Sequence, residues 1–175
     1  MNDDTTGLPD LLAPGLSVVF CGLNPGLSSA LEQRHFLNRS NRFWRTLHLA
    51  GFTTEQLSPL EDNRVLEFGC GLTTVVPRAT TSAQAVKAQE YRDAAQALED
   101  KIAQWQPTYV AFLGKPAYAA ITGQREIHWG AQAQGFVEAK VWVLPNPSGL
   151  NRSFSLDRLV EAYRELRIAA FTHPG

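Results

Sequence analysis

Residues 17–30 have the sequence SVVFCGLNPGLSSA, in which a short apolar run changes abruptly to Gly, Asn, Pro and Ser. An apolar, β-branched run bounded in this way is typical of a buried strand that ends in a loop. A second segment repeats the arrangement, because the apolar residues 141–144 lead into PNPSGLNR at 145–152. Ligands of open α/β sheets bind in the crevice outside the strand ends. The two Asn-Pro loops are therefore the expected functional surface.

The remainder of the chain predicts strands that alternate with helices. The expected strands are 17–21, 71–76, 109–113 and 141–144, with a short hairpin or loop near residue 135. The expected helices are 41–50, 55–67 with an interruption near residue 59, 82–104, a short one after residue 114, and 155–170. This alternation predicts an α/β three-layer sandwich with a central, mainly parallel sheet of about four to five strands. We expect residues 1–15 to form a loose arm and residues 16–170 to form a single domain.

Length and composition limit the class of protein. The 175 residues suit one domain with its own core, and the net charge of −1 argues against a uniformly basic nucleic-acid coat. No apolar stretch is long enough to span a bilayer and the N-terminus lacks the basic start of a signal peptide, so we expect a cytoplasmic protein. Cys21 and Cys70 each lie in an apolar stretch, which favours core residues over a disulfide or a metal site.

The two loops, together with the Asn-Arg-Phe-Trp sequence at 41–44, also carry a family resemblance. From about Leu16 to about Ile168 the chain resembles the mismatch-specific uracil/thymine-DNA glycosylases of the uracil-DNA glycosylase superfamily. The resemblance implies the fold of the uracil-DNA glycosylase superfamily. It also implies a monofunctional enzyme that hydrolyses the N-glycosidic bond of a mismatched base in double-stranded DNA. It implies no metal and no organic cofactor. Because a stacked base is inaccessible, the base must be flipped into a pocket.

For catalysis, the resemblance points to Asn24, where the wider superfamily often has Asp and this family has Asn. An amide oxygen can orient a water but cannot take its proton at neutral pH, so we expect slow hydrolysis that relies on stabilising the leaving base. Asn24 could equally cap the turn before Pro25. Asp93, on the expected helix 82–104, is a second candidate that could activate water if this helix leans over the cleft. A solvated helix face is the alternative for Asp93.

The base pocket that the resemblance implies has five candidate residues. Asn146 stands where many relatives carry a catalytic His, and here it would support the flipped nucleotide. Phe36 is the candidate stacking ring, with core packing as the alternative. Ser29 would close the pocket, with a turn as the alternative. Gly22 and Leu23 would contribute the backbone at the start of the first loop.

The second loop resembles the family's intercalating loop, which comprises Gly149, Leu150, Asn151 and Arg152 here. Leu150 would wedge into the gap that the flipped base leaves, because an exposed Leu between Gly and Asn is unusual for a core residue. The backbone near Gly149 and the side chain of Arg152 would then contact the unpaired guanine.

Basic residues cluster beside the first loop, where Arg34, His35, Arg39, Arg42 and Arg45 lie within twelve residues. Their position predicts phosphate contacts through Arg39 and Arg42, although a solvated helix face is the alternative. Lys115, at the start of a predicted helix, is a further phosphate candidate or else an ordinary surface lysine.

The expected partner is double-stranded DNA that contains a mismatched or damaged base, bound by a monomer with no membrane contact. A non-catalytic mismatch- or lesion-binding module of the same fold is the main alternative. A small-molecule nucleotide-binding protein is a more distant one, and it gives an exposed Leu150 no purpose.

Overall fold

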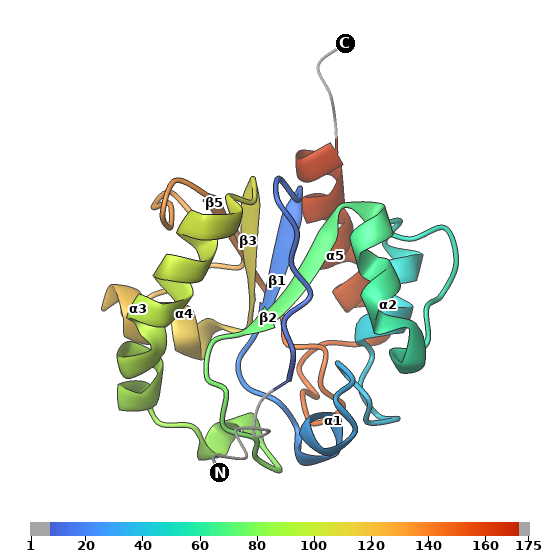
Figure 1. Ribbon diagram of the computed structural model, residues 1–175, viewed down its shortest axis with the longest axis horizontal. Helices are drawn as coiled ribbons and strands as arrows, with labels where there is room; N and C mark the ends of the chain where they lie inside the picture. Colours follow the sequence, from blue (N-terminus) through green and yellow to red (C-terminus); the bar gives the residue numbers. More distant parts are fainter. Residues whose placement is uncertain (1–7, 172–175) are drawn as a thin grey trace.

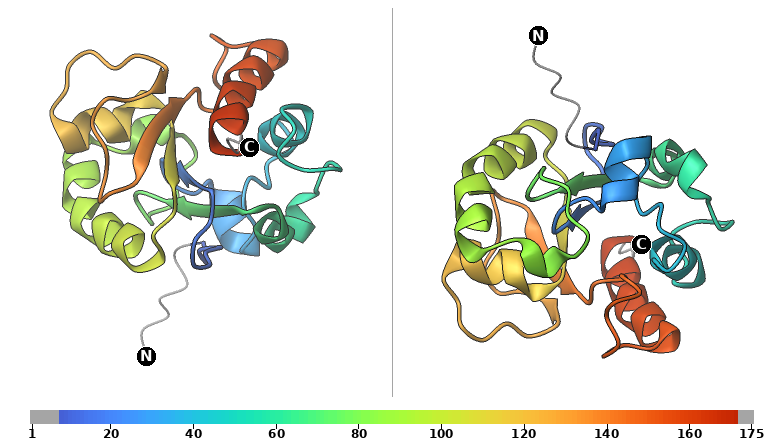
Figure 2. Two further views of the ribbon diagram at one scale, coloured as in Figure 1. Left: turned by 90° about the horizontal axis from the view of Figure 1, so that it is seen from above. Right: turned by 90° about the horizontal axis from the view of Figure 1, so that it is seen from below.

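The computed structural model describes residues 8–171, which form one five-stranded sheet with helices on both faces (Figures 1 and 2). The strand order is β2-β1-β3-β5-β4. The strands are β1 Val18–Gly22, β2 Cys70–Thr74, β3 Tyr109–Leu113, β4 Gly130–Ala131 and β5 Lys140–Leu144. Only β4 runs antiparallel to its neighbour, so the predicted mainly parallel sheet is confirmed.

Successive side chains of each central strand enter two different cores, as the two-residue period of a strand requires. Val19 and Cys21 pack into the core beneath α3 Ala88–Trp105 and α4 Lys115–Thr122. Val18 and Phe20 pack into the opposite core, with α2 Phe43–Leu49 and α5 Leu156–Phe171. The apolar stripe of α5 at Leu159, Val160, Tyr163 and Leu166 is buried there. Each such side chain contributes about 1.5–3 kcal/mol when fully buried.

The predicted elements differ from the structure at two helix starts and in the short helix α1 Leu27–Glu32, which was not predicted. Ser82 accepts a hydrogen bond from the Gln84 N–H and caps the short 3-10 turn η2 Ala83–Ala85, so α3 begins six residues later than predicted. The segment predicted as a helix from residue 55 is instead the 3-10 helix η1 Pro59–Phe68, which begins at a proline behind a capping box of Ser58 and Glu61. The later start of α3 lengthens the loop after β2, at the carboxyl edge of the sheet.

The N-terminal segment that precedes β1 is docked on the sheet, and the prediction of a loose arm is wrong for residues 8–15. The backbone of Leu11 pairs with Leu72 through two hydrogen bonds of 2.9 Å. The Asp10 carboxylate accepts a hydrogen bond from the Thr73 hydroxyl and forms an ion pair with Lys101 at 2.6 Å. The sequence did not reveal this docking, because the Pro, Gly and Asp content of the segment resembles a linker. Residues 1–7 of the predicted arm lie outside the described residues.

Candidate active site

A cavity of about 470 Å³ lies at the carboxyl ends of the four parallel strands. Its walls come from the loop and helix α1 Leu27–Glu32 after β1, from residues after β2, from the end of β3, and from the loop after β5. In Figure 1 this edge is the lower one, where α1 and the loop after β5 lie. The cavity falls within the usual 300–1,000 Å³ range of small-molecule sites. The two Asn-Pro loops therefore meet at one pocket, as their sequences predict.

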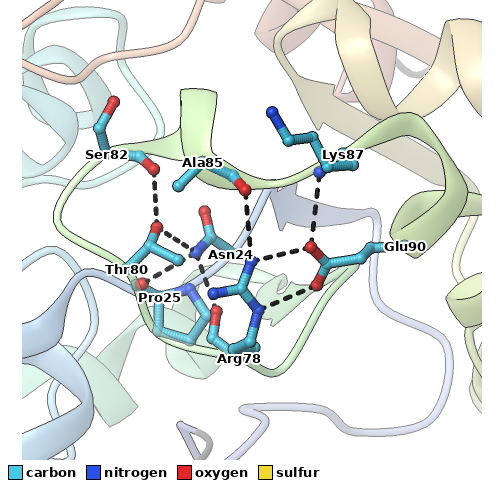
Figure 3. A network of polar contacts seen from close by, with 8 residues as sticks. All are labelled: Asn24, Pro25, Arg78, Thr80, Ser82, Ala85, Lys87 and Glu90. Atoms are coloured by element: carbon cyan, nitrogen blue, oxygen red, sulfur yellow. Dashed lines mark hydrogen bonds and ion pairs between the residues drawn. The ribbon is translucent and has the colours of Figure 1, made fainter.

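Asn24 lies in this cavity with its amide fixed by three acceptors (Figure 3). Its Nδ2 is 2.7 Å from the Thr80 hydroxyl oxygen, 2.9 Å from the Arg78 carbonyl oxygen and 3.3 Å from the Pro25 carbonyl oxygen. Among the described residues no group donates a hydrogen bond to its Oδ1. The amide is thus oriented so that the carbonyl oxygen remains available to a water or a ligand.

The loop after β2 supplies these acceptors and is itself held by an ion pair. The Arg78 guanidinium binds the Glu90 carboxylate through two hydrogen bonds of 2.8 and 3.0 Å and also donates to the Ala85 carbonyl. The Thr80 hydroxyl donates to the Ser82 carbonyl. Sequence reasoning missed Arg78 and Thr80, because they lie more than fifty residues from Asn24 and no local motif marks them.

The Phe36 ring lines the cavity and packs against the core at the same time. It stacks on Phe43 with ring centroids 4.0 Å apart, and its own φ of 53° lies in the left-handed region, which is unfavourable for a large side chain. The surrounding contacts hold this strained turn, since the buried Ser29 hydroxyl accepts the Leu37 N–H. Core packing of Phe36 is therefore confirmed, whereas its stacking on a base stays a prediction that its place in the cavity lining allows. Ser29 is a cavity residue that fixes the turn.

His35, which the sequence placed in the basic cluster beside the first loop, is instead a buried residue of the cavity lining. Its Nε2 lies 2.7 Å from the Pro9 carbonyl oxygen, which can only accept, so the ring carries its proton on Nε2. Its backbone N–H donates to the buried Asp62 carboxylate, which also pairs with Arg34. Burial lowers the pKa of His35 below 6.5, although the Pro9 carbonyl, Asp62 and Asp10 oppose this effect.

This environment predicts a pH-dependent stability. Near pH 6.5 the unfolded chain binds a proton at His35 more readily than the folded chain, so the free energy of unfolding falls as pH drops through this window. We expect the urea midpoint to be lower at about pH 5.5 than at about pH 7.5. His35→Gln, which keeps a donor for Pro9, should weaken this dependence, whereas His128→Gln on the surface should not. An equal pH dependence in all three proteins would contradict the assignment.

The loop after β5 is built on side chains that bond to its own backbone. Asn146 Oδ1 accepts the Ser148 N–H at 2.9 Å, and Asn151 Nδ2 donates to the Asn146 carbonyl at 2.9 Å. Gly149 passes so close to Ser40 that a Cβ would lie 2.7 Å from the Ser40 carbonyl oxygen, so only glycine fits. Leu150, 69% exposed, lies at the cavity as the wedge hypothesis requires.

Arg42 holds this loop in place and does not offer its charge to a phosphate, which corrects the sequence prediction. Its guanidinium donates to the carbonyls of Pro147, Ser148, Asn151 and Phe154 at 2.7–3.4 Å. Its backbone N–H also donates to Pro147. A guanidinium has five donors in a fixed fork, which suits such a cluster of carbonyls. The sequence could not reveal this role, because the acceptors lie 105–112 residues away.

The other sequence candidates divide between the site and the surface. Gly22 and Leu23 line the cavity, whereas Arg39 and Arg152 are exposed and make no ion pair with any described residue. Asp93 is exposed on α3, accepts a hydrogen bond from Gln89 and does not line the cavity. The helix does not lean over the cleft, so the hypothesis that Asp93 activates a water is wrong in this geometry.

Two further features concern cofactors and membranes. Within residues 8–171, no group of His, Cys, Asp and Glu side chains is arranged to hold a metal ion. Over the same range, no helix has the length and apolar character needed to cross a membrane. Cys21 and Cys70 are both buried and free, as expected of core residues.

Comparison with known structures places this architecture in a class. The solution NMR structure of a protein described as a candidate uracil DNA glycosylase from Methanosarcina acetivorans matches with a TM-score of 0.62 and 22% identity. The match covers 93% of this chain and 98% of that one. The chain is therefore an α/β protein of the uracil-DNA-glycosylase-like fold.

The family follows from the sequence model described as the uracil DNA glycosylase superfamily, which matches residues 9–167. The chain belongs to this superfamily, and in general terms it is a DNA glycosylase, a hydrolase that acts on DNA.

Proposed function

We propose that this protein is a monofunctional, mismatch-specific uracil DNA glycosylase, which flips uracil out of double-stranded DNA and hydrolyses its N-glycosidic bond. The observation that carries the proposal is a single cavity that contains the Asn24 amide and the Phe36 ring, with the exposed Leu150 at its rim. The proposed positions of the attacking water, the flipped base and the intercalating Leu150 side chain are therefore next to one another. All of them come from one chain, so a monomer suffices.

The proposed nucleophile is a water held by Asn24 Oδ1. The three acceptors around Nδ2 prevent the amide from turning, so the oxygen keeps its position without cost when the substrate binds. No Asp or Glu lines the described cavity, so the water is oriented rather than deprotonated. The rate must then depend on the departure of the base as a stabilised anion. This favours a slow enzyme whose substrates have good leaving groups.

The base would stack on Phe36 and hydrogen-bond to Asn146. Because Asn146 Oδ1 is engaged by the Ser148 N–H, its Nδ2 is the group left to donate to a carbonyl of uracil. The absence of lysine from the described cavity lining supports simple hydrolysis, since a Schiff-base lyase step needs an amine nucleophile.

Base release from three substrates tests the proposal and the wedge together. We expect wild-type protein to release uracil from a duplex with uracil opposite guanine, and less from uracil opposite adenine, where pairing opposes extrusion. Leu150→Ala should impair release most in a stably stacked duplex and least in single-stranded DNA, because less extrusion work remains there. Fluorescence of 2-aminopurine beside the uracil reports extrusion directly.

The outcomes separate the alternatives. Tight binding to mismatched duplex without any release would favour the non-catalytic, lesion-binding module. Equal losses for Leu150→Ala on every substrate, or no loss, would show that the loop is structural.

A further inference from the structure

Two cations flank a pair of aromatic rings outside the cavity lining. The Lys115 ammonium lies 4.4 Å from the centre of the Trp129 ring, which is 41% exposed. Trp129 contacts Phe154 edge to face, with centroids 5.3 Å apart. The Arg158 guanidinium lies 4.7 Å from the centre of the Phe154 ring. We call these four residues the cation–aromatic strip.

The strip shares the carboxyl edge of the sheet with the cavity. Lys115 begins α4, with one residue between it and the end of β3. Trp129 precedes β4, whose Gly130 pairs with Val143 near the end of β5. Phe154 lies in the loop after β5, and its carbonyl is one of the four that Arg42 holds. The strip is therefore continuous with the loop after β5 that carries Leu150, which we call the wedge loop, and the Arg42 guanidinium anchors both. Figure 1 shows β3 and β5 side by side in the sheet, with the loop after β5 at its lower edge.

Charge distinguishes the strip from ordinary surface packing. Neither Lys115 nor Arg158 forms an ion pair with an acidic side chain among residues 8–171. Both cations therefore lack an acidic partner on a chain whose net charge is −1, and Lys115 lies over an exposed indole. Cations and aromatic rings in one row are the elements with which proteins hold a nucleic-acid strand, through phosphate contacts and ring contacts respectively.

We propose that the cation–aromatic strip binds the DNA strand that flanks the flipped nucleotide, with Lys115 and Arg158 on phosphates and Trp129 against a sugar or base. The inference rests on the proposed function, because it takes the duplex to lie along the cavity edge. The rings hold the two cations in place before DNA arrives, which lowers the entropy lost on binding. The strip would extend the DNA-binding surface from the cavity toward the β4 side of the sheet.

Salt-dependent binding to a duplex with an abasic site opposite guanine tests the strip. Lys115→Gln and Arg158→Gln should each lower the log–log salt slope by about 0.9. Trp129→Ala should weaken binding about tenfold, whereas Trp129→Phe should retain most of the affinity. The matched control is Lys140→Gln, because the Lys140 ammonium lies 5.6 Å from the centre of the Tyr109 ring at the opposite edge of the sheet. This control should leave the slope unchanged.

Duplex truncation provides a second measurement with its own readout. Shortening the duplex on the side that reaches the strip should weaken DNA binding by the wild type. It should not weaken binding by the triple variant Lys115→Gln, Trp129→Phe, Arg158→Gln. Unchanged salt slopes in the single variants, or an equal change of slope in Lys140→Gln, would overturn the proposal that the strip binds DNA. If the strip variants behave as expected but the wild type releases no base, the catalytic proposal fails while the strip stands. If the wild type binds no duplex, both fail.

Discussion

Asn24→Ala is expected to reduce the single-turnover rate of uracil release by about 100-fold or more, because it removes the oxygen that positions the water. DNA binding should stay close to wild type, since Asn24 lies inside the cavity and not on the surface that meets the duplex. Release is measured by alkaline cleavage of an end-labelled duplex with uracil opposite guanine, and binding by fluorescence anisotropy. An unchanged release rate would remove Asn24 from the mechanism.

Two matched variants separate water positioning from a general loss of structure. Thr80→Val removes one acceptor of the Asn24 amide and should cause a smaller loss, because the Arg78 and Pro25 carbonyls still restrain it. Asp93→Asn should leave the rate unchanged, since Asp93 lies on the exposed face of α3. A slow Asp93→Asn enzyme would contradict the geometry described above and restore the carboxylate to the mechanism.

Arg42→Met is expected to have the second largest effect, through the wedge loop. The substitution removes the guanidinium donor from four carbonyls, of which those of Pro147 and Ser148 keep a backbone N–H donor. The loss should lower the free energy of unfolding by on the order of 2 kcal/mol. The freed loop would no longer hold Leu150 at the rim, so uracil release from stacked duplex should fall more than release from single-stranded DNA. The urea midpoint and the ratio of the two release rates measure these effects.

Arg39→Met is the natural control, because Arg39 is an exposed cation from the same basic cluster that donates to no described residue. It should leave the urea midpoint unchanged and lower the salt slope of DNA binding by about 0.9, as a phosphate contact requires. The opposite result, a stable Arg42→Met protein with a reduced slope, would reinstate Arg42 as a phosphate ligand.

The sequence by itself determined the sheet and the two loops. Apolar five-residue runs that end in Gly, Asn and Pro specify buried parallel strands locally, so β1, β3 and β5 lie within one residue of their predicted bounds. Because parallel strands end at one edge, the two Asn-Pro loops were expected at the same edge of the sheet. The strand order that brings them to one cavity comes from the tertiary structure. The family resemblance placed Asn24, Ser29, Phe36 and Asn146 at a pocket and Leu150 beside it as a wedge, and all five residues line the cavity.

Only the tertiary structure decided what the charged and polar side chains do. Arg42 is held by the loop after β5, Asn24 by the loop after β2, and His35 by the N-terminal segment, and each of these partners lies far away in the sequence. Sequence patterns report which residues are apolar at a helix or strand period, since burial follows that period. A long-range side-chain hydrogen bond depends instead on where two distant segments meet, and the residues next to it in the sequence do not indicate its partner. A cationic or amide side chain could therefore contact phosphate, water or the protein itself. In this fold Arg42 contacts backbone carbonyls of the protein.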